Sequence, residues 1–165
     1  MKRRLVVAGI VSLGLSGVLL AASPHWKHGA QPVCTIAADG SGHCTSGEVA
    51  GLGNGDVLIV VTLTASEGTF CHSPGNGKIV PGRNPATGSS TGGTFLSNSQ
   101  IKNGSLTVPS IDVAAPVVSD IPTPQEAGCP NANWTVTLDG VITYDGFYSF
   151  QQPAGQQINR LSFAF

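Results

Sequence analysis

Glycine and proline punctuate this chain so densely that long helices are excluded beyond its first residues. The 165 residues include 22 glycines and 11 prolines, and all but Gly9, Gly14 and Gly17 lie after residue 22. Glycine weakens helix interiors and proline breaks them. The apolar runs that remain are short and rich in β-branched residues, which is the pattern of strands. The chain therefore predicts an all-β fold.

The strongest strand signal covers residues 57–64, with the sequence Val-Leu-Ile-Val-Val-Thr-Leu-Thr. Its first half is apolar on both faces, which is typical of a strand inside a β-sandwich. The dipeptide Glu67-Gly68 then predicts a turn, with residues 69–71 as the returning strand of a hairpin.

The C-terminal third alternates apolar and polar residues between turn signals. Trp134, Val136 and Leu138 alternate with threonines, so one face of this strand is apolar. The dipeptides Asp139-Gly140 and Asp145-Gly146 are typical of hairpin turns. We therefore expect further strands at residues 141–144, 147–150 and 161–165.

Two stretches, residues 72–98 and 114–131, lack strand character. The first is crowded with Gly, Asn, Pro, Ser and Thr, and the second is rich in proline. Loops this long are uncommon in compact domains and are either functional or disordered. Short strands with such turn punctuation predict a single antiparallel β-sandwich, Ig-like or jelly-roll-like, over residues 31–165 with long polar loops.

The first 22 residues have the composition of a secretory signal peptide. The basic start Met1-Lys2-Arg3-Arg4 precedes an apolar run over residues 5–22, which Ser23-Pro24 ends. We expect cleavage after Ala22, with Ala30 as the second choice. The alternative is a membrane anchor formed by residues 5–22, because the run is only just long enough to span a bilayer. The expected product is a secreted protein with no membrane association after cleavage.

Charge excludes one class of partner. Removing Lys2, Arg3 and Arg4 leaves 5 basic and 9 acidic residues, a net charge of −4. A nucleic-acid-binding protein needs a basic surface to neutralise phosphates. We therefore expect no nucleic acid as a partner.

All four cysteines lie after the expected cleavage site, at Cys34, Cys44, Cys71 and Cys129. An even number of cysteines behind a signal peptide predicts disulfides. Among the possible pairings we favour Cys34–Cys44 with Cys71–Cys129. Gly40-Ser41-Gly42 is a turn that can bring the ends of the first pair together.

Several short motifs resemble a group of small secreted proteins of actinobacteria and similar soil bacteria. They are, in order, Gly51-Leu52-Gly53-Asn54, Cys71 with the turn Pro74-Gly75-Asn76-Gly77, Asn84-Pro85, Asn103-Gly104 and Cys129-Pro130. The resemblance covers about residues 48–150. It implies export and a β fold with a bridge like Cys71–Cys129, and it implies no activity and no site residues.

Two motifs could belong to a catalytic site or a metal site, but a structural role is favoured for both. Residues 88–92, Gly-Ser-Ser-Thr-Gly, fit G-x-S-x-G, but a nucleophile elbow needs a strand before it and a helix after it. His43-Cys44 and Cys71-His72 could together offer two imidazoles and two thiolates to zinc, but cysteines in disulfides do not bind metal. We expect no metal and no cofactor, with His43 and His72 at the surface.

Three aromatic residues are candidates for contact with a ligand. Trp134 lies on an alternating strand and is expected in the core. Tyr144 and Tyr148 flank the Asp145-Gly146 turn, where exposed rings could stack on a sugar or a protein partner.

No catalytic triad, metal-ligand spacing or marked carboxylate pair stands in the sequence, so we expect a protein without enzymatic activity. We expect an interaction or structural role with an extracellular or cell-envelope partner, since loops on a rigid scaffold often bind. The alternatives are a carbohydrate- or small-ligand-binding module, and a small secreted hydrolase or metalloprotein.

Overall fold

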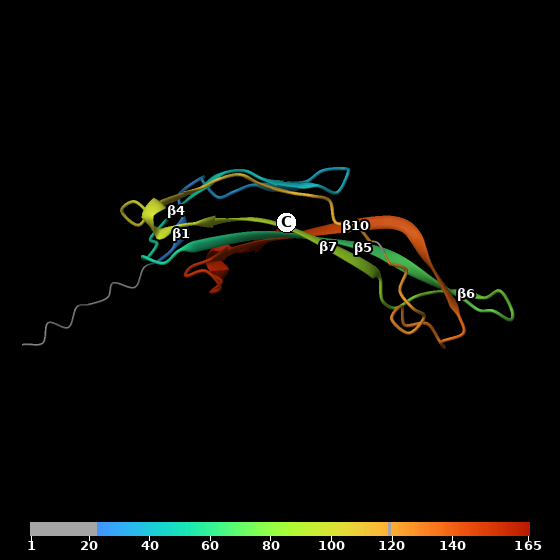
Figure 1. The fold of residues 1–165 in the computed structure, drawn as a ribbon. Helices are drawn as coiled ribbons and strands as arrows, with labels where there is room; N and C mark the ends of the chain where they lie inside the picture. The colour runs from blue at the N-terminus through green and yellow to red at the C-terminus, as the bar shows by residue number, and fades with distance from the viewer. Residues whose placement is uncertain (1–22, 119) are drawn as a thin grey trace, which may run out of the picture.

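The computed structural model describes residues 23–118 and 120–165, so the expected signal peptide, residues 1–22, lies outside the described residues. Within them the chain is built from short and long antiparallel strands (Figure 1). The strands are β1 (His25–Trp26), β2 (Cys34–Ile36), β3 (Gly42–Cys44), β4 (Gly47–Ala50), β5 (Val57–His72), β6 (Ile79–Pro81), β7 (Ala86–Leu96), β8 (Leu106–Val108), β9 (Ile111–Val113), β10 (Thr135–Gln151) and β11 (Phe163–Ala164). Two short 3-10 helices are η1 (Asn98–Gln100) and η2 (Asn159–Leu161).

The main sheet is organised around the pairing of β5 with β10. The two strands run antiparallel from the pair Thr135–His72 to the pair Gln151–Leu58, with one interruption in register. β5 alone has 16 residues, which at about 3.3 Å per residue is roughly 50 Å. β7 and β6 add to the other edge of β5, one after the other, and β11 adds to β10.

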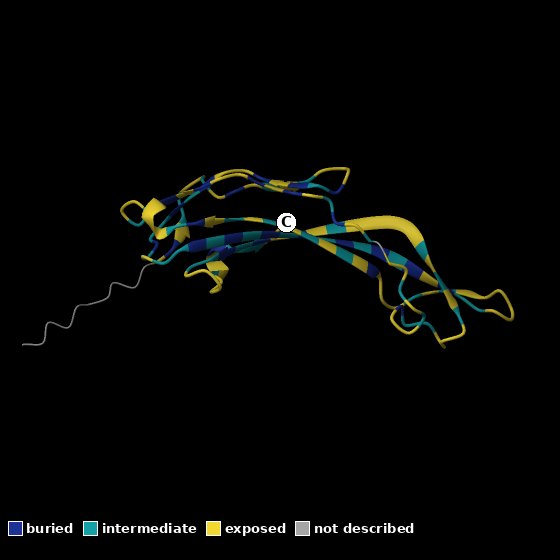
Figure 2. Cartoon of the chain, in the orientation of Figure 1, coloured by how far each residue is buried: buried dark blue, intermediate teal, exposed yellow. Residues whose placement is uncertain are grey.

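A second layer covers one end of the main sheet. It consists of two small sheets, β1-β4-β8 and β2-β3-β9, which lie above the main sheet in Figure 1. Alternate residues of β5, such as Ile59, Val61 and Leu63, are fully buried against this layer. They pack with Val108 and Val113, and Figure 2 shows buried residues along strands of both layers. Beyond the second layer, the main sheet continues as an arm (Figure 1).

The all-β antiparallel class predicted from the sequence is confirmed, and both favoured disulfides, Cys34–Cys44 and Cys71–Cys129, are present. The second layer covers only part of the main sheet, so a closed sandwich is not established. No helix in the described ranges is long and apolar enough to cross a membrane.

The expectation that residues 72–98 form one long loop is wrong, because residues 86–96 are strand β7. Inward-facing positions of β7 include Gly88, Ser90 and Gly92, which pair with Ala65, Leu63 and Val61 of β5. A β-carbon on Gly88 would lie 2.0 Å from the carbonyl oxygen of Val117. The small residues therefore let the chain after β9 cross close to the sheet, and pairing with β5 overrides their low strand propensity.

The turns expected at Glu67-Gly68, Asp139-Gly140 and Asp145-Gly146 are also wrong, because all three lie within long strands. Leu138 pairs with Thr69 and Ile142 with Glu67, so the residues between them form a bulge. A β-carbon on Gly68 would lie 2.1 Å from a side-chain oxygen of Asp139. Glycine here makes room for a neighbouring side chain instead of bending the chain back.

The described fold begins before residue 31, the start expected for the domain. His25 and Trp26 pair with Ala50 and Val49 of β4, and the Trp26 ring packs edge-on against Phe150 with a centroid distance of 5.8 Å. Residues 23–30 are therefore part of the structure.

Substituting Gly88 by alanine is expected to destabilise the protein, because its methyl group would overlap the Val117 carbonyl. Overpacking of this kind costs about 1–3 kcal/mol in free energy of unfolding. Gly75→Ala is the matched control, because a β-carbon at Gly75 meets no atom within 4 Å. Urea unfolding, monitored by circular dichroism, would measure the free energy of unfolding of both variants. Equal midpoints for the two variants would contradict the close crossing at Gly88.

Candidate functional site

The structure does not bring the three candidate aromatic residues to one exposed site. Tyr148 is fully buried, where it stacks on Phe163 with ring centroids 5.0 Å apart. Burial raises the pKa of the Tyr148 hydroxyl, which has no hydrogen-bond partner among the described residues. Tyr148 is therefore a core residue, and the prediction that it flanks an exposed turn is wrong.

Tyr144 and Trp134 are half-buried, and they lie ten residues apart along the chain. The Tyr144 ring lies against Gly40, at the tip of the β2–β3 hairpin, where a β-carbon would come within 2.6 Å of the ring. Tyr144 therefore holds the second layer on the main sheet. Trp134 precedes β10 at the far end of the arm and is not in the core cluster, contrary to expectation.

The two histidines proposed as remote metal ligands lie in different parts of the fold. Nδ1 of His43, on β3, is 2.6 Å from a carboxylate oxygen of Asp112, and His72 ends β5 with Nε2 2.8 Å from the hydroxyl of Thr137. Gly42 lies against Leu63, nine residues of strand from His72, which is about 30 Å. The described ranges hold no group of three or more metal-ligating side chains.

The Gly-Ser-Ser-Thr-Gly motif is part of strand β7 and not a nucleophile elbow. Ser90 faces the second layer, where its hydroxyl donates a hydrogen bond to the carbonyl oxygen of Ala114. This contact ties the chain after β9 to the sheet.

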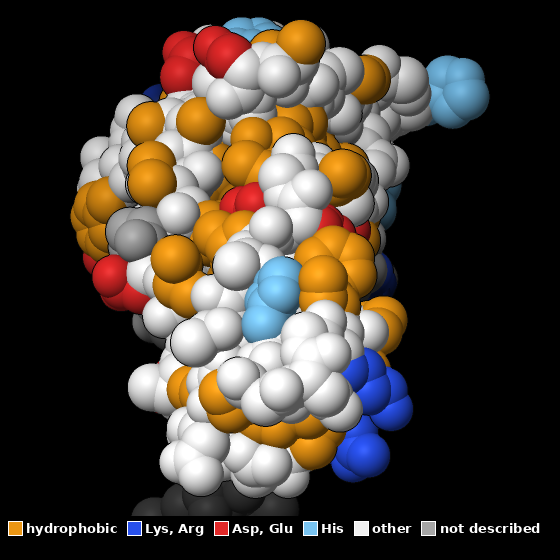
Figure 3. All heavy atoms as spheres, turned by 90° about the vertical axis from the view of Figure 1, so that its right-hand side faces the viewer, with side chains coloured by type: hydrophobic (Ala, Val, Ile, Leu, Met, Phe, Trp, Pro, Cys, Tyr) orange, Lys and Arg blue, Asp and Glu red, His pale blue; other side chains and the backbone are white. Residues whose placement is uncertain are grey.

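The first candidate surface is the arm. We define it as β5 from Ala65 onward, β6, β10 up to Tyr144, and the loop residues 73–78, 82–85, 114–118 and 120–134. Figure 3 looks onto its end and shows apolar side chains interspersed with polar and charged ones. Nine large apolar side chains are exposed in the described residues, and six belong to the arm. The six are Phe70, Ile79, Val117, Ile121, Val141 and Ile142.

One edge of β10 carries no strand along the arm, as far as the described residues extend. β11 pairs with Phe147 and Tyr148 only, and Phe165 exchanges backbone hydrogen bonds with Gly146. Every second residue of a strand directs its backbone groups to the same side. Tyr144 and Ile142 therefore present their N–H and C=O groups to this open edge.

The end of the arm is fastened by a disulfide and a hydrogen-bonded turn. Cys71 of β5 is bridged to Cys129 across 58 residues of sequence. The carbonyl oxygen of Ala127 accepts hydrogen bonds from the backbone N–H groups of Arg83 and Asn84, at 2.8 and 3.2 Å. The part of the loop around Ala127 and Cys129 is thus held against β5 and the turn that follows β6.

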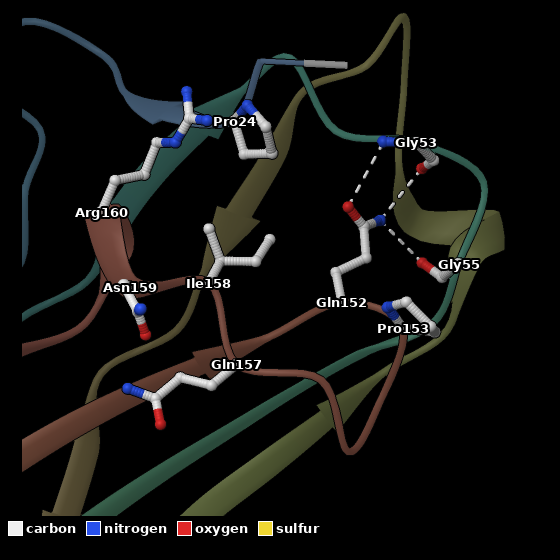
Figure 4. A pocket seen from close by; sticks show the side chains of 9 residues that line it. All are labelled: Pro24, Gly53, Gly55, Gln152, Pro153, Gln157, Ile158, Asn159 and Arg160. Carbon is white, nitrogen blue, oxygen red and sulfur yellow. Dashed lines mark hydrogen bonds between the residues drawn. The ribbon is translucent and has the colours of Figure 1, made fainter. Parts of the chain in front are cut away.

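The second candidate site is a pocket at the opposite end of β5. It has a volume of about 650 Å³ and forms where three segments meet: the segment at Pro24, the loop before β5 and the turn after β10 (Figure 4). Its lining residues are Pro24, Gly53, Gly55, Gln152, Pro153, Gln157, Ile158, Asn159 and Arg160.

The Gln152 side chain spans one wall of this pocket. Its amide nitrogen donates to the carbonyl oxygens of Gly53, at 3.0 Å, and Gly55, at 2.8 Å. Its oxygen accepts from the N–H of Gly53 at 3.3 Å (Figure 4). The loop that contains the Gly51-Leu52-Gly53-Asn54 motif is therefore held in place by a residue about 100 positions later in the chain.

A smaller pocket, of about 490 Å³, lies on the arm beside the disulfide. It is lined by Val80, Pro81, Arg83, Gly128, Cys129 and Pro130. Its position places it on the same arm as the exposed apolar side chains.

Sequence reasoning pointed to the long polar loops and to Tyr144, which belong to the arm, but it missed the pocket and the open edge of β10. The pocket depends on Gln152 and Arg160, which carry no motif, and the open edge depends on where β11 stops. The only sequence signal near the pocket is the glycine-rich motif at residues 51–54, which we interpreted solely as a resemblance.

Acid is expected to loosen the turn at the end of the arm. The Glu126 carboxylate accepts hydrogen bonds from the backbone N–H and the hydroxyl of Thr123, at 2.9 and 2.8 Å. These bonds lower the pKa of Glu126. Because the pKa of Glu126 is lower in the folded state, its ionised carboxylate stabilises the turn at pH values above the ordinary glutamate pKa. This contribution to stability is lost as the pH falls through the lowered pKa. An NMR titration that follows the Glu126 carboxyl and the Thr123 amide measures the pKa of Glu126. Glu126→Gln is the control. A Glu126 pKa at or above that of an unstructured glutamate would contradict the prediction.

Comparison with known proteins gives no further guide. No family model, no curated protein and no solved structure matches the chain. The functional argument therefore starts from the geometry of the arm and the pocket.

Proposed function

We propose that this chain is an exported, non-catalytic binding protein that contacts a protein partner outside the cell through its arm. The open edge of β10, beside exposed apolar side chains on a fastened arm, is the observation that carries the proposal. An unpaired edge offers backbone hydrogen bonds to a strand of another chain. Nearby apolar side chains add contact area that excludes water.

The partner strand would pair beside Ile142 and Tyr144. These residues direct their backbone groups to the open edge, and Val141 and Ile142 are 63% and 43% exposed as whole residues. Pairing supplies affinity through the main chain, while contacts to side chains supply selectivity. The bulge between Leu138 and Ile142 limits the length of regular edge. Bulges protect sheet edges from indiscriminate pairing, so a short, matched partner strand is favoured over aggregation.

Export is part of the same proposal. Residues 1–22 have the composition of a signal peptide, and cysteines in disulfides are typical of proteins outside the cytosol. Both bridges, Cys34–Cys44 and Cys71–Cys129, join segments of the described fold. We propose membership of the small secreted bacterial proteins that its motifs resemble, with retention by residues 5–22 as the alternative location.

Replacing Val141 with lysine is expected to weaken partner binding by about tenfold or more, because burying an unpaired charge at an interface costs over 1.4 kcal/mol. Val33→Lys is a closely matched control, since the two valines are 62% and 63% exposed and Val33 lies away from the arm, beside β2. Retention of the purified protein on isolated envelopes of the producing cells measures binding. Protease treatment of the envelopes tests whether the partner is a protein.

Loss of retention with Val141→Lys, but not with Val33→Lys, is the expected result. Both variants should keep the thermal midpoint of the natural chain, because exposed positions contribute little to stability. Equal retention of the two variants would show that the arm is not the contact. Retention that survives protease treatment would point to a partner other than protein.

A further inference from the structure

The tripeptide Gly-Asn-Gly occurs twice in this chain, at residues 53–55 and at residues 75–77, and Asn103 also precedes a glycine. An asparagine before glycine can react with its own backbone, because glycine has no β-carbon to hinder the approach of its nitrogen to the side-chain amide. The two tripeptides have the same local sequence. Any difference in their reactivity therefore comes from the fold.

The first tripeptide is held by hydrogen bonds along its whole length. The carbonyl oxygen of Asn54 accepts a bond from Nδ2 of Asn98 at 3.1 Å. The carbonyl oxygens of Gly53 and Gly55 accept bonds from the Gln152 side chain, at 3.0 and 2.8 Å (Figure 4). The reaction requires the backbone to rotate until the glycine nitrogen meets the side-chain carbon of the asparagine. Three anchored carbonyls in succession oppose that rotation.

Asn103 is also held, in a tight turn. The backbone groups of Lys102 and Ser105 exchange two hydrogen bonds around it, at 2.8 and 2.9 Å, and the carbonyl oxygen of Gly104 accepts a third from the N–H of Leu52 at 3.0 Å. The φ angle of Asn103 is 52°. Its backbone is therefore fixed in the turn.

The second tripeptide is free of such anchors. It lies in the loop between β5 and β6, at the outer end of the arm (Figure 1), and the loop is closed by a bond of 2.9 Å from the N–H of Ser73 to the carbonyl oxygen of Lys78. Residues 75–77 are exposed, and their backbone groups make no hydrogen bond within the described residues. A β-carbon on either glycine would meet no atom within 4 Å. The backbone around Asn76 can therefore rotate.

One hydrogen bond positions the Asn76 side chain for reaction. The backbone N–H of Lys78 donates to Oδ1 of Asn76 at 3.1 Å. The ring that this bond closes contains both Cγ of Asn76 and the backbone nitrogen of Gly77, so the two reacting atoms are kept on the same side of the turn. The same N–H faces the oxygen on which negative charge develops during attack. The loop combines a mobile backbone with a positioned electrophile.

We propose that Asn76 is a site of spontaneous covalent modification, attacked by the backbone nitrogen of Gly77. That nitrogen loses its proton and forms a bond to Cγ of Asn76. The bond from Cγ to Nδ2 breaks, and ammonia leaves with the proton. Water then opens the cyclic imide at either carbonyl, which gives aspartate or isoaspartate. The end of the arm gains a negative charge, and the reaction does not depend on the protein contact proposed at β10.

The test follows all three asparagines in the purified protein, incubated at neutral pH in heavy-oxygen water and analysed by peptide mapping with mass spectrometry. Asn76 is expected to convert at least about tenfold faster than Asn54 or Asn103. In the reduced chain unfolded in guanidinium, Asn54 and Asn76 are expected to convert at similar rates, since their neighbours are identical. Equal rates in the folded protein would overturn the proposal, as would an Asn76 that is equally favoured in the unfolded chain.

Gln152→Ala tests the explanation from the opposite end of β5, because it removes the bonds that anchor Gly53 and Gly55. Conversion of Asn54 is expected to rise several-fold, and conversion of Asn76 to stay unchanged. Gln157→Ala is the matched control, since the Gln157 side chain points away from this loop (Figure 4). An unchanged Asn54 rate in Gln152→Ala with a natural circular dichroism spectrum would overturn protection by the anchored loop. The comparison within the natural chain stands without this variant.

Discussion

The pairing of β5 with β10 is the interaction on which the rest of the structure depends. The two strands stay in register over most of their length, on either side of one bulge. Every other element of the main sheet attaches to one of them. The buried residues of β5 form the floor on which the second layer packs. Because the pair is longer than the second layer that covers it, its end projects as the arm and leaves one edge of β10 open.

Small side chains decide how closely the two layers approach. Gly88 and Gly92 of β7 lie against the backbone of Val117 and Asp112, and Gly42 lies against the Leu63 side chain. The disulfide Cys34–Cys44 closes the hairpin that carries Gly42. Close approach of this kind needs glycine on one side, because a β-carbon would overlap the opposite chain. The high glycine content thus reflects packing between layers as well as turns.

The two candidate sites use opposite ends of the same strand pair. At one end, Gln152 ties the loop before β5 to the turn after β10 and shapes the pocket beside Arg160. At the other end, the Cys71–Cys129 disulfide and the Ala127 carbonyl, which accepts from the N–H groups of Arg83 and Asn84, fasten the long loop to the rest of the arm. Each site is therefore held by contacts between residues far apart in the sequence.

Local residue patterns by themselves determined the all-β class, because frequent glycine and proline exclude long helices and β-branched runs favour strands. They also favoured, among the possible pairings, the disulfide pairs that the structure has, since Gly40-Ser41-Gly42 can close one short loop and only one pairing of the other two cysteines then remains. Tertiary structure alone decided what the dipeptides Asp139-Gly140 and Asp145-Gly146 do. A glycine in the sequence is compatible with a turn, a bulge or a close contact between chain segments. In this fold the pairing of β10 with β5 places these glycines in a bulge and in a close contact, and not in turns. The pocket and the open edge likewise needed the fold, because they depend on the meeting of distant segments and on where β11 ends, which no local pattern encodes.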